Sequence, residues 1–229
     1  MTRFACALVA VALILSSAML GHSEQAPVKT FPLDTVSDLE LVNGKAEVAT
    51  HLGRRAVRFV PLPGHDSPRD SILGILTATD FKDGTIEADV AGSPRPGAPP
   101  DARGFIGIAF RVQPHGSRYE CIYLRPSNGR ADDQLQRNHS TQYVSEPDYP
   151  WFRLRQENPG EYESYVDLEP GAWTKIKLVV AGAKARLYVH GADQPALIVN
   201  DLKLGDTRGQ VALWAQWSTD SYFANLTIK

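Results

Sequence analysis

Cysteine is scarce in this sequence, and no excess of charge of either sign is present. The two cysteines among 229 residues are Cys6 and Cys121, and Cys6 lies in an amino-terminal apolar run. A chain cut after that run keeps one cysteine and forms no internal disulfide. Because Cys121 precedes the apolar residues 122–124, we interpret it as a small buried residue. The balance of 24 Lys and Arg against 26 Asp and Glu gives no reason to expect nucleic acid or a membrane surface as partner.

Long apolar runs are missing beyond the first residues of the chain. Residues 4–20 form a nearly unbroken apolar run after a positively charged start, and small residues follow up to Ser23. This pattern predicts that 1–23 is a signal peptide, with a cut after Ala18 as the alternative. A retained membrane anchor is the other interpretation, at the short limit for a span. We therefore expect a secreted or periplasmic protein, with 24–229 as a single domain.

Apolar residues at helical spacing are also missing, and strand patterns take their place. The best helix candidate, 131–137, is short and polar. Alternating or apolar runs bounded by turn residues predict strands at 39–42, 46–49, 56–60, 72–79, 85–90, 105–112, 119–124, 173–180, 185–189, 196–199, 210–217 and 222–228. Asn43-Gly44 predicts a tight hairpin between the first two runs. This many short strands indicate an antiparallel sandwich or barrel.

The alternation within the strands predicts which side chains share a face. Ile106, Ile108 and Phe110 should point inward between two sheets, which directs Arg111 and Tyr123 outward across a shared hollow. Aromatic rings and hydrogen-bonding side chains on one sheet face suit a sugar. The predicted ligand-binding residues of this face are Arg111, Tyr119, Tyr123, Arg125, Trp214 and Gln216.

The longest connection between strand regions, 126–167, is rich in Arg and aromatic residues. Connections of this length within a domain are often functional. It is either an excursion packed on the sheet edge or the rim of a ligand cleft. The candidates that it adds for ligand binding are Arg137, Asn138, Tyr149, Trp151 and Arg153.

Several of these segments resemble a known family. Residues 84–90, 104–111 and 119–126 resemble successive strands of concanavalin A-like lectin and glucanase domains, and 173–180 and 209–214 resemble later ones. Within that superfamily, the chain is similar to LamG-like domains and to 3-keto-disaccharide hydrolase domains, which are related to family 16 glycoside hydrolases. The resemblance implies an all-β fold: a two-sheet antiparallel jelly-roll sandwich with a long inserted loop region. It also implies a concave face that commonly holds carbohydrate.

Catalytic residues are less well defined by the same resemblance. Retaining glucanases of the superfamily carry Glu-x-Asp-x-x-Glu on one strand, whereas Glu87 and Asp89 are followed here by Gly92. The missing third acid leaves the two-carboxylate mechanism unsupported. Likeness to 3-keto-disaccharide hydrolases keeps Glu87, Asp89, Glu120 and His139 as candidates for acid–base chemistry.

Three functions remain open at this point. The first is an exported module that binds a glycan on its concave face. The second is a glycoside hydrolase or lyase that acts on modified sugars such as 3-keto-disaccharides, and the third is an adhesive module that binds protein. No cofactor is expected: no histidine pair has metal-ligand spacing, and no spaced set of oxygen ligands predicts calcium. The oligomeric state is not predicted.

Overall fold

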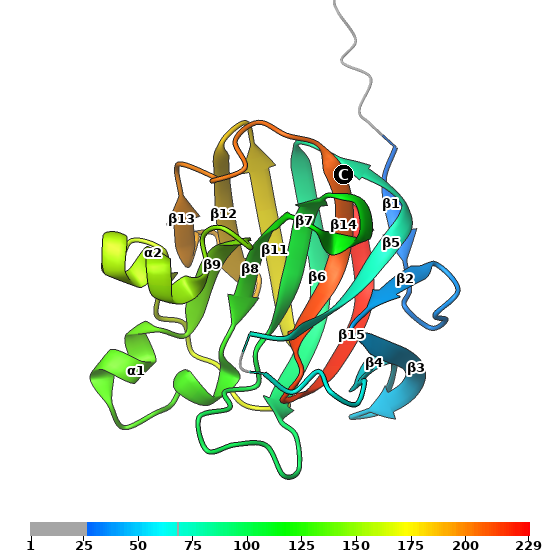
Figure 1. Ribbon diagram of the computed structural model, residues 1–229, viewed down its shortest axis with the longest axis horizontal. Helices are drawn as coiled ribbons and strands as arrows, with labels where there is room; N and C mark the ends of the chain where they lie inside the picture. The colour runs from blue at the N-terminus through cyan, green and yellow to red at the C-terminus, as the bar shows by residue number, and fades with distance from the viewer. Residues whose placement is uncertain (1–26, 68) are drawn as a thin grey trace, which may run out of the picture.

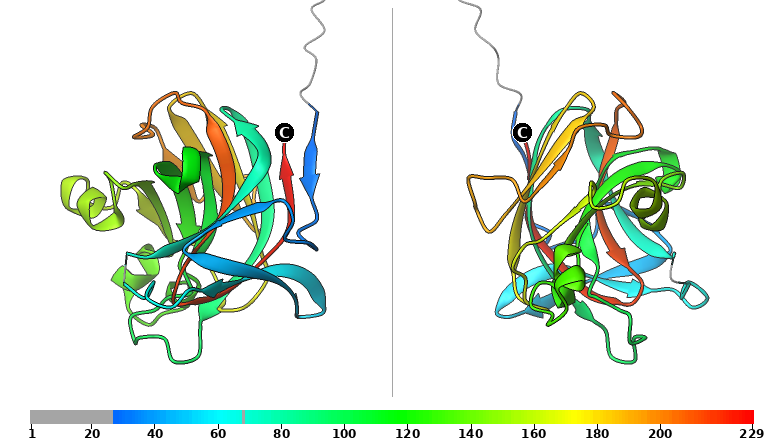
Figure 2. Two further views of the ribbon diagram at one scale, coloured as in Figure 1. Left: turned by 45° about the vertical axis from the view of Figure 1, so that its right-hand side comes forward. Right: turned by 90° about the vertical axis from the view of Figure 1, so that its left-hand side faces the viewer.

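Two antiparallel sheets face each other as the two layers of the structure (Figures 1 and 2). The computed structural model describes residues 27–67 and 69–229. The predicted signal peptide therefore lies outside the described residues. Each predicted strand corresponds to an observed one, so the prediction of an all-β sandwich is confirmed.

The larger sheet has eight strands. Its order is β13 (Leu197–Val199), β12 (Lys184–Val189), β11 (Thr174–Ala181), β6 (Gly84–Pro94), β15 (Thr219–Ile228), β4 (Arg54–Pro61) and β3 (Gly44–His51), with β1 (Lys29–Phe31) paired to β15. The other sheet has seven strands. Its order is β10 (Glu163–Ser164), β9 (Thr141–Glu146), β8 (Tyr119–Leu124), β7 (Ile106–Val112), β14 (Gly209–Gln216), β5 (Ser71–Phe81) and β2 (Leu39–Val42).

The main hydrophobic core lies between the sheets. Ile106, Ile108 and Phe110 of β7 are fully buried there, together with Phe223 of β15 and Leu178 of β11. Successive side chains of a strand point to opposite faces, so every second apolar residue reaches this core. The predicted inward stripe of β7 is therefore confirmed for these three residues.

The predicted hairpin at Asn43-Gly44 is wrong. Strand β2 pairs with β5 in the seven-stranded sheet, whereas β3 pairs with β4 in the eight-stranded sheet. Asn43 adopts a left-handed φ of 61° and its side-chain amide donates to the carbonyl of Ser71 at 3.1 Å. The left-handed residue thus turns the chain from one sheet to the other, a conformation that Asn tolerates better than most residues.

The segment 126–167 is more ordered than its sequence pattern predicts. It contains the outer strands β9 and β10 and two short helices, α1 (Gln134–Asn138) and α2 (Trp151–Glu157). Figure 1 shows both helices beside β8 and β9, at one side of the seven-stranded sheet. Asp133 caps α1 by accepting a hydrogen bond from the backbone of Gln136 at 2.6 Å. None of the helices within 27–67 and 69–229 is long and apolar enough to cross a membrane.

Candidate functional site

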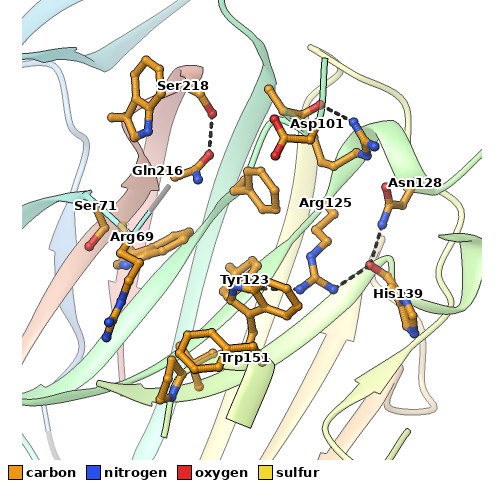
Figure 3. Close-up of a pocket in the computed structure, with 18 of the residues that line it drawn as sticks. Arg69, Ser71, Asp101, Tyr123, Arg125, Asn128, His139, Trp151, Gln216 and Ser218 are labelled. Carbon is orange, nitrogen blue, oxygen red and sulfur yellow. Dashed lines mark hydrogen bonds between the residues drawn. The ribbon is translucent and has the colours of Figure 1, made fainter. Parts of the chain in front are cut away.

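A pocket of about 480 Å³ lies over the outer face of the seven-stranded sheet. Its floor comes from β8 and β14, and its walls come from the loop after β6, the start of β5 and both short helices (Figure 3). A second apolar cluster, separate from the core between the sheets, underlies it. This volume is in the range of small-ligand sites, so the pocket is the leading candidate for a binding site.

The floor is built on three neighbouring strands. Gly107 of β7 pairs in register with Trp214 of β14 on one side and with Tyr123 of β8 on the other. The rings of Tyr123 and Trp214 stack, with their centroids 4.7 Å apart and an angle of 21° between the rings. Small side chains on the outer face of β7 thus leave room for two aromatic rings.

Tyrosine hydroxyls fix the floor further. The indole nitrogen of Trp214 donates to the hydroxyl of Tyr119 at 3.3 Å, and that hydroxyl lies 3.1 Å from the hydroxyl of Ser71. Burial raises the pKa of Tyr123 to about 12 and also raises the pKa of Tyr119 well above its usual value. Both phenols are therefore neutral at physiological pH and can donate hydrogen bonds.

A buried arginine lies at one end of the floor. The Arg125 side chain is 6% exposed, and its guanidinium donates to the carboxylate of Glu163 at 2.9 Å and to the hydroxyl of Tyr123 at 3.2 Å. The same group also donates to Gln142 at 2.9 Å and to the carbonyl of His139 at 3.1 Å. Figure 3 shows it between Tyr123 and His139. These four hydrogen bonds fix the position of the Arg125 guanidinium, and therefore of its positive charge.

Glu163 connects this arginine to a second one. Arg155 of α2 donates to Glu163 through Nε at 3.0 Å and through Nη2, and Nε2 of His139 lies 3.4 Å from the same carboxylate. Burial raises the pKa of Glu163, but the hydrogen bonds and charges of Arg155 and Arg125 outweigh burial and lower it below the usual value. Burial likewise holds the pKa of His139 below its usual value, although Glu163 opposes this. At neutral pH the carboxyl is thus ionised and the imidazole neutral.

Exposed aromatic side chains border the pocket. Trp151 and Phe152, at the start of α2, are 41% and 44% exposed. The Arg155 guanidinium lies 4.8 Å from the centre of the Trp151 ring, and that of Arg69 lies 5.6 Å from the centre of the Phe152 ring. These cation–π contacts orient both rings at the rim while leaving much of their surface to a ligand.

The opposite end of the pocket carries an acidic group. Glu146 ends β9 and pairs in register with Tyr119. Burial raises the pKa of the Glu146 carboxyl, while the charge of Arg69 opposes the rise. This end of the pocket therefore holds a carboxyl beside an arginine.

The structure brings about half of the predicted site residues into this pocket. Those that line it are Tyr119, Tyr123, Arg125, His139, Trp151, Trp214 and Gln216. Other residues of the long segment lie outside its lining: Arg137, Asn138, Tyr149 and Arg153. These four instead contact their own neighbours, such as the hydroxyl of Tyr165 for Arg137 and the carboxylate of Glu157 for Arg153.

The prediction that Arg111 faces the hollow is wrong. Arg111 has a left-handed φ of 52°, and the pairing of β7 with β14 shifts register at this point. The irregularity breaks the period of two, so that Val112 joins the apolar cluster under the pocket. The Arg111 side chain is fully buried elsewhere, where it donates to the carbonyls of Lys82 at 3.0 Å and of Gly182 at 2.7 Å.

The four candidates for acid–base chemistry do not share one site. Glu87 and Asp89 lie on β6 of the other sheet, where Asp89 accepts from Arg54 at 2.7 Å and Glu87 lies 3.4 Å from the Lys229 amine. Glu120 is fully buried. It accepts hydrogen bonds at 2.7 Å from the Tyr143 hydroxyl and from the backbone of Leu204. Of the four, His139 alone lines the pocket.

Sequence patterns missed several residues of the pocket. Glu163, which does not line the pocket itself but binds its arginines Arg125 and Arg155, lies in the two-residue strand β10, which is too short for alternation to reveal which way it faces. Arg103 lies in a loop and Asn128 in a three-residue 3-10 helix, Pro126–Asn128, and neither segment carries periodicity. Their only signal was a position in long connections, which are often functional.

No group of three or more His, Cys, Asp or Glu side chains among the described residues is arranged to hold a metal ion. Protein-family models give no match to the sequence, and no curated protein matches it.

Solved structures do share its fold. Carbohydrate binding module CBM66 from Bacillus subtilis is 14% identical, with a TM-score of 0.53 over 84% of this chain and 96% of that chain. A Bacillus subtilis protein of unknown function with a galectin-like fold is 11% identical, with a TM-score of 0.55 over 87% of this chain and 94% of that chain. Bacillus licheniformis beta-glucanase is also 11% identical, with a TM-score of 0.51 over 90% of this chain and 99% of that chain. The predicted concanavalin A-like jelly-roll fold is thereby confirmed.

Proposed function

We propose that this protein is an exported carbohydrate-binding domain that holds a glycan in the pocket over its seven-stranded sheet. The observation that carries this conclusion is the joining of exposed aromatic rings and fixed hydrogen-bonding groups in one cavity of about 480 Å³. A sugar ring presents an apolar C–H surface and a set of hydroxyls, so it needs both kinds of contact at once. Among proteins of the same fold are a carbohydrate binding module and a beta-glucanase, which supports this choice of ligand.

The rim and the floor would have different roles in binding. Trp151 and Phe152 offer exposed ring surface on which a sugar can stack. Tyr123 and Gln216 line the pocket with a hydroxyl and an amide that would pair with sugar hydroxyls. The floor rests on a rigid sheet, so little ordering accompanies binding.

The acids predicted from the sequence give no support to hydrolysis in this pocket. A glycosidase needs two carboxyl groups on either side of the bond that it cleaves. Glu87 and Asp89 belong to the other sheet and Glu120 is buried away from the pocket, so none of them reaches a ligand held there. Recognition without cleavage needs none of the three.

Isothermal titration calorimetry with a panel of neutral and acidic oligosaccharides tests the proposal. We expect saturable binding of at least one saccharide, weakened about 3- to 10-fold by Trp151→Ala through lost stacking. Tyr165→Ala is the matched control, because Tyr165 is 42% exposed, as Trp151 is 41%, but does not line the pocket. Absence of binding across the panel, or equal effects of both variants, would contradict the proposal.

Export is tested separately by mass spectrometry of the chain produced with its own first residues in a secreting host. Cleavage after Ser23, or after Ala18, supports it. An uncut chain that stays inside the cell argues against export and leaves the binding proposal intact.

A further inference from the structure

The end of the pocket at Arg125 holds more positive than negative charge. Arg125 and Arg155 share one carboxylate, that of Glu163. Oε1 of Glu163 accepts from both arginines, and Oε2 accepts from Arg155 and lies 3.4 Å from His139. Since one negative charge faces two positive ones, this cluster keeps a net positive charge while the imidazole is neutral.

A third arginine adds to this charge. Arg103 lines the same pocket and is half-buried. Its guanidinium donates to the carbonyls of Pro100 at 2.8 Å and of Ala102 at 3.0 Å. Within residues 27–67 and 69–229, no carboxylate forms an ion pair with Arg103, so its charge is balanced by no side chain in direct contact.

Carboxylates of the pocket itself offset the charge of this end only weakly. Asp70 precedes Ser71, whose hydroxyl contacts that of Tyr119, so it lies toward the other end. Asp101 and Asp133 line the pocket but are exposed, so water screens their charges. Glu146 pairs in register with Tyr119, at the start of β8, whereas Arg125 follows the end of that strand. At about 3.3 Å per residue, the two ends of the pocket are about 20 Å apart.

From this charge distribution we infer that the glycan is acidic, a uronate-containing oligosaccharide whose carboxylate binds at the end formed by Arg103, Arg125 and Arg155. This inference rests on the proposed function, which it narrows to one class of sugar. A planar guanidinium matches a carboxylate with two parallel hydrogen bonds, and burial strengthens such a pair. Arg155 has a terminal nitrogen, Nη1, that makes no hydrogen bond to another described residue, and its side chain is 34% exposed. It is thus available to a ligand.

Calorimetry with matched pairs of oligosaccharides tests the inference on the intact protein. Tetrasaccharides of galacturonate, glucuronate, mannuronate and guluronate are each compared with the same tetrasaccharide after methyl esterification, which removes the charge and keeps the sugar. We expect at least one acidic tetrasaccharide to bind about ten-fold more tightly than its ester and to lose affinity as sodium chloride is raised.

A pair of arginine variants tests whether the sugar carboxylate binds at the end of the pocket that contains Arg103. Arg103→Gln should weaken binding of the acidic sugar about ten-fold and leave binding of the ester unchanged. Arg95→Gln is the control: Arg95 lies in the same loop, is also half-buried and donates to a backbone carbonyl, that of Trp217, but does not line the pocket.

The outcomes separate the inference from the proposed function. If esters or other neutral sugars bind as tightly as the acids, or if both arginine variants act alike, the acidic-sugar inference is wrong while carbohydrate binding stands. If no saccharide binds, acidic or neutral, both are wrong.

Discussion

Tyr123 and Trp214 stack across a strand that separates them in the sheet. Their ring centroids are 4.7 Å apart although the residues lie on β8 and β14, with β7 between these strands. The contact is possible because Gly107, the residue of β7 in register with both, has no side chain on that face. One glycine therefore permits the aromatic floor of the pocket.

Gly107→Ala should damage both the fold and the floor. An added Cβ would lie 2.5 Å from Cα and 2.6 Å from Cβ of Tyr123, so strands β7 and β8 must shift. We expect a loss of about 2 kcal/mol in the free energy of unfolding, measured in urea, and weaker saccharide binding. In the control, Gly160→Ala, no atom lies within 4 Å of the new Cβ, and its positive φ of 77° costs only about 1 kcal/mol. Equal saccharide binding by the two variants would contradict the role of Gly107.

Arg111→Met should destabilise the protein without changing the pocket. The buried guanidinium donates to the carbonyls of Lys82, Gly182 and Gly205 and to the carboxylate of Asp83. Methionine fills a similar space but leaves these acceptors without a donor, which costs about 3 kcal/mol in urea unfolding.

The control for Arg111 is Arg208→Met. The pair of Arg208 with Asp80 is more than half exposed on both sides, so its loss costs less than about 1 kcal/mol. Saccharide affinity should be unchanged in folded Arg111→Met, because Arg111 does not line the pocket. If Arg111→Met lowered the saccharide affinity and left the free energy of unfolding unchanged, Arg111 would belong to the binding site after all.

Alternation of apolar residues was sufficient to predict the sandwich, because every strand with one face in the core must place every second residue there. The prediction failed where a single left-handed residue interrupts a strand. At Arg111, a φ of 52° redirects the strand, and arginine does not signal such a conformation as glycine does. At Asn43, with a φ of 61°, the turn was signalled, but it leads from one sheet to the other and closes no hairpin. Glu120 is a different case: strict alternation puts it on the core face, from which a position at the rim or a break in register was expected, whereas the structure keeps the register and buries it.

The pocket was predictable on regular strands and, through Trp151 and His139, in part of the long connection. Tyr123, Arg125 and Trp214 follow from the period of β8 and β14. Glu163 and Arg103 belong to segments that are ordered by tertiary contacts, which local periodicity does not record. The sequence therefore predicted the aromatic floor of the pocket, but not the ion pairs of Glu163 with Arg125 and Arg155 at one end of it.

Comparison with Glu120→Gln should show that the folded protein is more stable when the buried carboxyl of Glu120 is protonated. Burial raises the pKa of Glu120 above its usual value, against the hydrogen bond from Tyr143. A group with a raised folded-state pKa contributes stability that is full below its unfolded pKa, about 4.3, and is lost as the pH rises through the folded value. We expect the free energy of unfolding of the wild type, relative to Glu120→Gln, to fall as the pH is raised from about 4 to about 7.

The control for Glu120 is Glu161→Gln, which changes an exposed carboxyl by the same substitution. Its difference from the wild type should stay nearly constant over the same range of pH. A constant difference for Glu120→Gln as well would show that its carboxyl does not titrate in the folded protein as the structure implies.

Glu163→Gln should give a pH dependence of the opposite sign. Arg155 and Arg125 lower the pKa of Glu163 despite its burial, so its contribution to stability is full above the unfolded pKa of about 4.3 and is lost as the pH falls through the folded value. At about pH 7, glutamine leaves the buried Arg125 without a counter-charge, and we expect a loss of about 3 kcal/mol in urea unfolding. The loss should shrink below about pH 4, where the wild-type carboxyl is itself protonated.

An exposed ion pair provides the comparison for Glu163. Glu157→Gln removes the partner of Arg153 in a pair whose two side chains are 43% and 46% exposed, so about 0.5 kcal/mol or less is expected at any pH. A loss for Glu163→Gln that is equally small at neutral pH would mean that Arg125 has another source of negative charge. That result would also remove the excess of charge inferred for Arg125 and Arg155, and would leave Arg103 alone as the reason to expect an acidic sugar.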